Sequence, residues 1–418
     1  MNEKKFIKSV FTLAGGTFVA QLLPFIVLPV LQRDYFGPTE FGLLTLYVTL
    51  SDLLIGISGM KYEYAIVNTN RLKDAVNLLS LSVVSILTMS IFSLVVLSII
   101  YFLIPSLSFV QNLGLFLFFV PLSVLFYGVF DAINFWLNRS EKYLHMSLGK
   151  VVYSGASESV KLISGIRGLG DGLIFGRIAG QFLAFCFNVI LFFKNYRNML
   201  GLVSLKRMKE LVVIHKRYPI YVMPSVLIGA LITFAYIQLF QEYFGGEKVG
   251  LMGVSVSYIA VAFGILSSAF GQVFYKKIAD VKDYFQLKKL YVRYALWLCV
   301  PSALTVLFVY LLPDEWVVDF LGERWAEMLP VTRIMVLWMS VSFVSSSLSF
   351  IYLKLEIQKT MFLLDLIHLV LVIAFVIIGH TITGTFMGTL YYFVAAQFIH
   401  YLMAIYIALF YLKKKSIL

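Results

Sequence analysis

The sequence predicts an all-α, polytopic membrane protein with about 12 transmembrane helices. Composition is the first indication: 60% of the 418 residues are hydrophobic, only 13% are charged, and the mean hydropathy is +0.89. A single soluble core could not bury that much apolar surface. The second indication is the recurrence of mostly apolar runs of about 18 or more residues, because a helix of that length crosses a hydrocarbon core of about 30 Å.

Each apolar run, bounded by charged or turn-forming residues, predicts one span. The N-terminal MNEKKFIKSV has the positive start of a signal peptide. The apolar run behind it is too long and has no small-residue cleavage site, so we expect a retained first helix. In chain order the predicted spans are 6–31, 40–67, 75–104, 113–137, 146–166, 172–193, 219–241, 249–274, 291–312, 328–353, 360–379 and 385–411.

An internal repeat indicates that these spans form two related halves. The segments YFGPTEFGLLTLYVTLSDLLIGI (35–57) and YFGGEKVGLMGVSVSYIAVAFGI (243–265) match at eight of 23 positions, at an offset of 208 residues. Because that offset is almost half of the chain, we expect an N-terminal six-helix bundle (1–194), a basic linker (195–217) and a C-terminal six-helix bundle (218–418). An even number of spans in each half predicts a pseudo-twofold axis along the membrane normal. Chance similarity between two apolar helices is the alternative, since transmembrane helices share a small alphabet.

The distribution of Lys and Arg predicts the orientation. With the N-terminus inside, 25 of the 34 basic residues fall in cytoplasmic segments, six lie on or near the outer side, and three are buried in spans. This bias predicts that both termini are cytoplasmic. The net charge of +12 then reflects topology and attraction to anionic lipid, so no nucleic-acid partner is expected.

The linker contains SLKRMKELVVIHKRY, which predicts an amphipathic helix that begins after Ser204. We interpret this helix as a tether on the inner leaflet, and lipid sensing is the alternative. The two cysteines of the chain, Cys186 and Cys299, lie in apolar runs, so buried free thiols are expected rather than a disulfide framework.

Polar residues in the second span predict a functional surface. Charges at membrane depth cost about 2.5 to 3.5 kcal/mol each on insertion scales, so they indicate a pathway or a pair. Residues three, four or seven positions apart predict one polar face, which cannot contact lipid and is interpreted as the wall of a water-filled cavity. Lys61 lies beside this face near the cytoplasmic end. The face consists of Thr45, Thr49, Asp52, Gly56, Gly59 and Glu63.

The fifth span repeats the pattern more densely. Its stripe consists of Lys150, Ser154, Ser157, Glu158 and Lys161. Glu158 and Lys161 are spaced i, i+3 and can pair with each other. A buried ion pair that only holds helices together is the alternative interpretation.

Three further polar features are predicted. Polar side chains along one edge of the fourth span indicate interhelical hydrogen bonding. Asp365 and His368, spaced i, i+3 in the eleventh span, could relay a proton or form a structural pair. Arg177 and Arg333 lie near predicted outer ends, where we interpret them as snorkelling side chains. The edge of the fourth span consists of Tyr127, Asp131, Asn134 and Asn138.

Several catalytic motifs are missing from the sequence. It contains no P-loop, no HExxH, no Cys/His ligand set and no nucleophile elbow. Neither ATP hydrolysis nor metal chemistry is therefore predicted, and no cofactor is expected.

Segments spread over nearly the whole chain resemble a known family. They are YFGPTEFGLLTLYVTL (35–50) with KYEYAIV (61–67), RYPIYVMPSVL (217–227), YFGGEKVGLMGVS (243–255) with GQVFYKKIAD (271–280), and FLGERWAEMLPVTRIM (320–335) followed by FVSSSLSFIYLKLEIQ. Together and in this order they resemble the O-antigen and capsule repeat-unit flippases (Wzx type) of the multidrug/oligosaccharidyl-lipid/polysaccharide (MOP) transporter superfamily.

The resemblance implies two six-helix bundles around a central cavity lined by the first two helices of each half. It implies transport of undecaprenyl-diphosphate-linked glycan from the inner to the outer leaflet of the bacterial cytoplasmic (inner) membrane, for O-antigen, lipopolysaccharide or capsule synthesis. A polysaccharide polymerase and chain-length machinery are the implied partners. Lys61 and Glu63 match the basic and acidic positions of the family's R-Y-E type motif, with Lys in place of the commoner Arg. Phe263 stands where relatives often have a proline, which puts a kink there in doubt.

On this resemblance, Lys61, Lys150 and Lys161 are expected to bind the diphosphate or acidic sugars. Buried acids would contact hydroxyls or carry coupling protons, with a proton gradient, a sodium gradient or the membrane potential as the driving force. These acids are Asp52, Glu63, Asp131, Glu158 and Asp365. In the repeat, Asp52 matches Ala260 and Glu63 matches Gly271, so the polar wall belongs mainly to the N-terminal half.

Two alternatives remain at the level of sequence. A multidrug or cation antiporter of the same superfamily is one, because the buried set holds five acids against three lysines. A membrane glycosyltransferase, polymerase or ligase is the other. Such enzymes usually place catalytic residues in sizeable outer loops, and the largest outer loop here is only about 313–327. A transporter rather than an enzyme is therefore expected.

Overall fold

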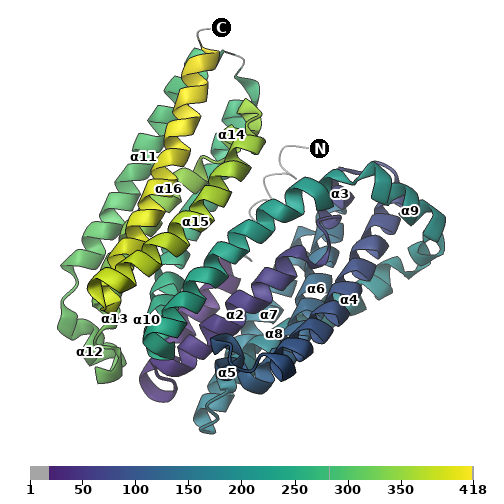
Figure 1. Ribbon diagram of the computed structural model, residues 1–418. Coiled ribbons are helices and arrows are strands. Elements are labelled where there is room, and N and C mark those ends of the chain that lie inside the picture. The colour runs from purple at the N-terminus through teal and green to yellow at the C-terminus, as the bar shows by residue number, and fades with distance from the viewer. Residues whose placement is uncertain (1–17, 282, 417–418) are drawn as a thin grey trace. The chain divides into compact units, whose positions relative to one another are not determined.

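The structure, a computed structural model, describes residues 18–281 and 283–416, which are almost entirely helical. A helix over 18–30 continues into the π-helix η1 (Leu31–Tyr35). It is followed by α2 (Pro38–Ser58), α3 (Glu63–Asn68), α4 (Leu72–Leu103), α5 (Ser108–Leu113), α6 (Val120–Arg139), α7 (Tyr143–Ile166), α8 (Gly172–Tyr196) and the linker helix α9 (Leu205–Ile214). The second half contains α10 (Met223–Asp280), α11 (Tyr284–Leu311), α12 (Asp314–Leu321), α13 (Met328–Ser347), α14 (Phe350–Leu355), α15 (Gln358–Thr383) and α16 (Phe386–Lys415) (Figure 1).

Nine helices in the described part of the chain are long and apolar enough to cross a membrane. One of them, α10, is broken into two helices at Gly245, which has φ 79° and ψ 175°. The charged helix α7 and the partly described helix over 18–30 are the other two long helices. Each half then contributes six long helices, which confirms the predicted all-α, multi-pass fold.

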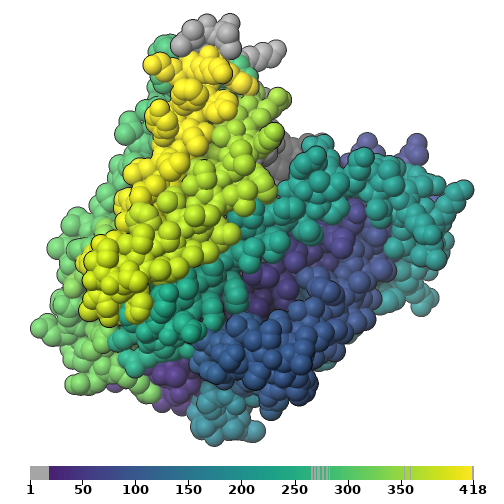
Figure 2. Space-filling view, viewed as in Figure 1, coloured from purple at the N-terminus to yellow at the C-terminus, as the bar shows by residue number. Residues whose placement is uncertain are grey.

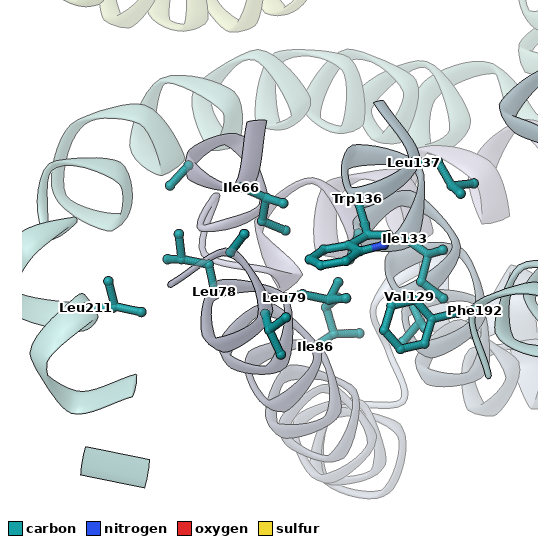
Figure 3. Packing of buried hydrophobic residues seen from close by; sticks show 14 of the residues in the cluster. Ile66, Leu78, Leu79, Ile86, Val129, Ile133, Trp136, Leu137, Phe192 and Leu211 are labelled. Carbon is teal, nitrogen blue, oxygen red and sulfur yellow. The ribbon is translucent and has the colours of Figure 1, made fainter. Parts of the chain in front are cut away.

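The chain forms two compact units. Unit 1 contains the chain up to Phe36 and Leu43–Gln238, and unit 2 contains Gly37–Gly42 and Leu239–Leu418. In the core of unit 1, Trp136 of α6 lies in one apolar cluster with Ile66, Phe192 and Leu211, from α3, α8 and α9 (Figure 3). The linker helix is therefore part of the core of unit 1.

Aromatic rings hold together the core of unit 2. The ring of Phe240 in α10 makes edge contacts with Phe386 and Phe393 of α16. Large apolar side chains are exposed on the helices that Figure 2 shows in space-filling form, including Phe102 on α4 and Val370 on α15. Such surfaces are expected where helices contact lipid.

The two copies of the repeat begin at equivalent breaks, since η1 ends at Tyr35 before α2, and Gly245 interrupts α10. Matched glycines of the two copies then bring the backbones together within unit 2. A Cβ at Gly42 would lie 1.9 Å from the carbonyl oxygen of Gly246, and a Cβ at Gly250 would lie 1.8 Å from that of Pro38. Small residues allow helices this close approach, so the repeated glycines are packing positions.

The predicted second span, 40–67, is wrong at its end. α2 stops at Ser58, and α3 starts at Glu63. Between them Met60 and Lys61 have φ of 49° and 61°, a left-handed conformation that is uncommon for residues other than glycine. The spacing predicts Glu63 on the same helix face as Asp52, and this prediction is wrong, because Glu63 lies in the next helix.

The linker helix α9 begins after Ser204, as predicted, and packs against α4. The Ser204 N–H donates a hydrogen bond to Asn77 Oδ1 (2.8 Å). Arg207 donates from Nε and Nη2 to the two carboxylate oxygens of Asp74, at 2.7 and 2.8 Å. The hydrogen bonds to Asp74 raise the pKa of the Arg207 guanidinium. Together with the bond from Ser204, they hold the linker helix against unit 1.

Candidate functional site

The turn between α2 and α3 holds a buried lysine. Lys61 is only 7% exposed, and its Nζ lies 3.5 Å from Glu63 Oε1 and 5.2 Å from the centre of the Tyr64 ring. Gly59 makes this geometry possible, because a Cβ there would lie 2.4 Å from Glu63 Oε2. The left-handed backbone at Lys61 stores strain, and such strain concentrates at functional sites.

Glu63 and Lys61 belong to a larger charged cluster in unit 1. Glu63 Oε2 is buried and has no hydrogen-bond partner among the described residues. Asp131 on α6 lies within electrostatic range of Glu63, Lys61 and Lys150 on α7. The structure thus brings four of the predicted site residues together, two of each sign.

A second charged pair lies further along α7. Lys161 Nζ donates to Glu158 Oε1 at 2.7 Å, so the predicted pair is formed. Glycines of α8 allow close packing against it: a Cβ at Gly176 would lie 2.4 Å from Lys161 Cγ. The pair is therefore positioned by two tightly packed helices.

The interpretation of Arg177 as a snorkelling residue is wrong. Its Nη2 donates to Asp52 Oδ1 at 2.5 Å, and its Nη1 lies 3.4 Å from the Tyr153 hydroxyl oxygen. The Arg177 side chain is 17% exposed, whereas that of Asp52 is 53% exposed. A carboxylate within a spanning helix is costly in lipid unless it is paired, and Arg177 supplies the pairing charge for Asp52.

Tyrosines surround this pair, and of these only Tyr127 belongs to a predicted polar feature, the edge of the fourth predicted span. The rings of Tyr127 and Tyr153 lie 5.7 Å apart, and both lie within electrostatic range of Arg177. The Tyr47 hydroxyl is hydrogen-bonded to Ser123 Oγ at 2.7 Å. The sequence alone does not single out these tyrosines, because tyrosine is common throughout it.

The polar edge of the fourth predicted span makes an interhelical contact, as expected. Asn188 Nδ2 of α8 donates to the Phe130 carbonyl at 3.1 Å and lies 3.4 Å from Asn134 Oδ1 of α6. In this part of the molecule the structural interpretation is confirmed.

Asp365 belongs to unit 2, whereas the charged cluster belongs to unit 1. Its predicted neighbour, His368, hydrogen-bonds through Nε2 to Gln397 Oε1 at 2.9 Å and stacks on His400 with ring centres 3.7 Å apart. Asp365 itself lies within electrostatic range of Tyr352 and Tyr401. His368 is thus partnered by α16.

Comparison with known proteins gives fold-level relatives. No protein-family model and no curated protein matches the chain. Among solved structures, the chain is similar to the lipid II flippase MurJ in an inward closed conformation, with 14% identity over 97% of this chain and 90% of that chain and a TM-score of 0.70. It is also similar to an inward-facing multidrug resistance MATE family transporter of the MOP superfamily (14% identity, 98% and 96% covered, TM-score 0.63). A third is the MATE multidrug transporter DinF-BH (15% identity, 97% and 95% covered, TM-score 0.64).

These likenesses define the class of fold. The chain has the two-bundle, 12-helix fold of MOP superfamily transporters. Its structural neighbours include both a flippase and multidrug transporters, so the fold admits more than one kind of substrate.

Proposed function

We propose that this protein is a flippase that moves undecaprenyl-diphosphate-linked oligosaccharide repeat units, of O-antigen, capsule or a related polysaccharide, from the inner to the outer leaflet of the bacterial cytoplasmic membrane. In this proposal it works by alternating access, with both termini in the cytoplasm. A polysaccharide polymerase and chain-length machinery would use the product on the outer side.

The physical need for such a protein is clear. Each glycan hydroxyl that enters hydrocarbon without a partner costs several kcal/mol. A polar cavity that opens to one side at a time removes this cost, while the prenyl tail stays in the lipid.

The observation that carries the proposal is a set of three lysines in unit 1, of which Lys61 is buried and Lys150 and Lys161 are partly buried. Lys61 is held in a left-handed turn, with its ammonium group beside Glu63, and Lys161 is held against Glu158. Lys150 lies within electrostatic range of Asp131. Buried or partly buried cations in or beside spanning helices favour an anionic substrate, and a diphosphate can compete with a carboxylate for each of them.

The second part of the proposed site would take the sugars. Asp52 offers a half-exposed carboxylate, held in place by Arg177, that can accept hydrogen bonds from hydroxyls. The apolar faces of sugar rings pack on aromatic rings, which Tyr127 and Tyr153 supply beside this pair.

The membrane potential supplies a sufficient driving force in this proposal. Moving negative charge outward across an inside-negative membrane gains about 2.3 kcal/mol per charge per 100 mV. A proton or sodium gradient is the other proposed source, with Glu63, Asp131 or Asp365 carrying the ion.

A multidrug or cation antiporter is the second candidate function. Two observations favour it: Lys61, Lys150 and Lys161 each lie near a carboxylate, and Glu63 Oε2 is buried without a hydrogen-bond partner in the described part of the chain. A lipophilic cation would compete with the lysines for these carboxylates.

One experiment separates the two candidates. The gene is deleted in the source bacterium, and surface polysaccharide, lipid-linked repeat units and drug resistance are measured. A flippase predicts loss of surface polysaccharide with repeat units retained on the inner leaflet. Altered drug resistance with normal surface polysaccharide would instead establish the antiporter.

A further inference from the structure

A separate polar cavity lies in unit 1, on its predicted cytoplasmic side, where α6 ends, α7 begins and α8 ends. Its volume is about 260 Å³, smaller than the cavities that hold drug-sized ligands. It is lined by Leu137, Lys142, His145, Leu191, Asn195 and Tyr196. Neither proposed part of the transport site uses any of these residues.

The lining has the chemistry of an anion site. Lys142 supplies a positive charge, and His145 and Tyr196 supply further hydrogen-bond donors. Asn195 Nδ2 donates to the Leu191 carbonyl at 2.9 Å, which leaves one of its two N–H groups for a ligand. None of the described residues that line the cavity is acidic. The two leucines provide an apolar wall.

The start of α7 strengthens this electrostatic preference. Lys142 is the N-cap residue of α7, and its side chain makes no capping hydrogen bond to the N–H groups of the first turn. The first turn carries no acidic residue, so the helix dipole favours an anion there, and the acidic Glu141 directly precedes the N-cap. The lysine and the helix end therefore act on the same side of the cavity.

The surroundings indicate where the anion comes from. Leu144 and Leu148 on α7 and Phe193 on α8 are exposed beside the cavity, as expected of lipid-facing positions. Lys194 and Arg197 continue the basic edge at the end of α8. A cavity with a basic rim and apolar neighbours at the membrane surface matches a phosphate group on a lipid.

We propose that this cavity binds a phosphate group, supplied by the headgroup of an anionic phospholipid in the inner leaflet. Tyr196 connects the cavity to the core, because its ring packs against Trp136 at 5.6 Å between centres. The bound headgroup would thereby hold the cytoplasmic ends of α6, α7 and α8 together. This site is independent of the transported substrate.

The test uses the full chain in nanodiscs or detergent, with lipid retention measured by native mass spectrometry. The probes are phosphatidylglycerol, phosphatidylcholine as the zwitterionic reference, and inorganic phosphate as a soluble competitor. The variant is Lys142→Ala with His145→Ala. The control is Lys413→Ala with Lys414→Ala, which removes two exposed basic residues of α16 in unit 2.

We expect the cavity variant to bind phosphatidylglycerol about tenfold more weakly, the loss of roughly one charge-assisted hydrogen bond, while the control changes by less than about twofold. Equal losses in both variants would show diffuse attraction to basic surface and overturn the proposal. Release of the lipid by millimolar inorganic phosphate supports a phosphate site open to soluble anions as well. If the protein binds phosphatidylcholine as tightly as phosphatidylglycerol, the proposed anionic-lipid site is overturned. The milder Lys142→Gln variant keeps the test valid if the double variant fails to fold.

Discussion

Asp52 on α2 and Arg177 on α8, 125 residues apart in the sequence, form an ion pair in which the carboxylate is half exposed and the guanidinium is mostly buried. This asymmetry predicts unequal mutational effects. Asp52→Leu leaves a buried, uncompensated guanidinium and should destabilise the protein by about 3 kcal/mol. Arg177→Leu leaves a carboxylate that water can reach, and should cost clearly less. Thermal unfolding in detergent measures both.

The double variant completes this cycle. If the pair is the reason for the loss, Asp52→Leu combined with Arg177→Leu should be more stable than Asp52→Leu alone. Strictly additive losses would show that the two side chains act independently.

Gly59 is predicted to be essential for the Lys61 turn. Gly59→Ala puts a Cβ 2.4 Å from Glu63 Oε2, so the carboxylate must move relative to Lys61. We expect a loss of transport together with destabilisation of about 1 to 3 kcal/mol. The matched control is Gly155→Ala in α7, where a Cβ meets no described atom within 4 Å. Equal behaviour of the two variants would contradict this account of the turn.

The repeated glycines are predicted to control the folding of unit 2. Gly42→Ala would force the backbone away from Gly246, and this overpacking should cost about 3 kcal/mol or more and reduce the yield of folded protein. Gly229→Ala in α10 is the control, because no described atom lies within 4 Å of the added Cβ. Size-exclusion profiles of the two variants at equal expression provide the measurement. A normal Gly42→Ala profile would count against close backbone packing.

Acid is predicted to loosen the linker helix at His215. Burial lowers the pKa of His215 below its ordinary value of 6.5, against the opposing effect of nearby Asp74. Because the folded pKa is below the unfolded pKa, the folded state is favoured fully above about pH 6.5 and loses stability as the pH falls through that value. Hydrogen exchange of α9 should therefore be faster at pH 5 than at pH 7.5. The His215→Gln variant should show a smaller difference, and an unchanged difference would assign the effect to another group.

The fold was predictable because each long helix corresponds to an apolar run that can be recognised in the sequence. The Glu158–Lys161 pair was predictable for a similar reason, since residues i, i+3 on a helix must be neighbours. The Asp52–Arg177 pair was not, because sequence spacing does not determine which face of α8 meets α2. The break before Glu63 was also missed. The apolar residues of α3 follow those of α2 closely in the sequence, so the two helices look like one span. Neither Met60 nor Lys61 is a residue type that indicates a left-handed backbone.

We propose that lysines of unit 1 hold the anionic part of a lipid-linked glycan. The most direct measurement is the rate at which purified protein, reconstituted in vesicles, moves undecaprenyl-diphosphate-linked repeat units between leaflets. Lys61→Ala and Lys161→Ala should each slow this rate by about tenfold or more, given the energy of a hydrogen bond to a charged group, while the exposed-lysine control Lys414→Ala should leave it unchanged. Wild-type rates for both Lys61→Ala and Lys161→Ala at equal protein levels would contradict the claim.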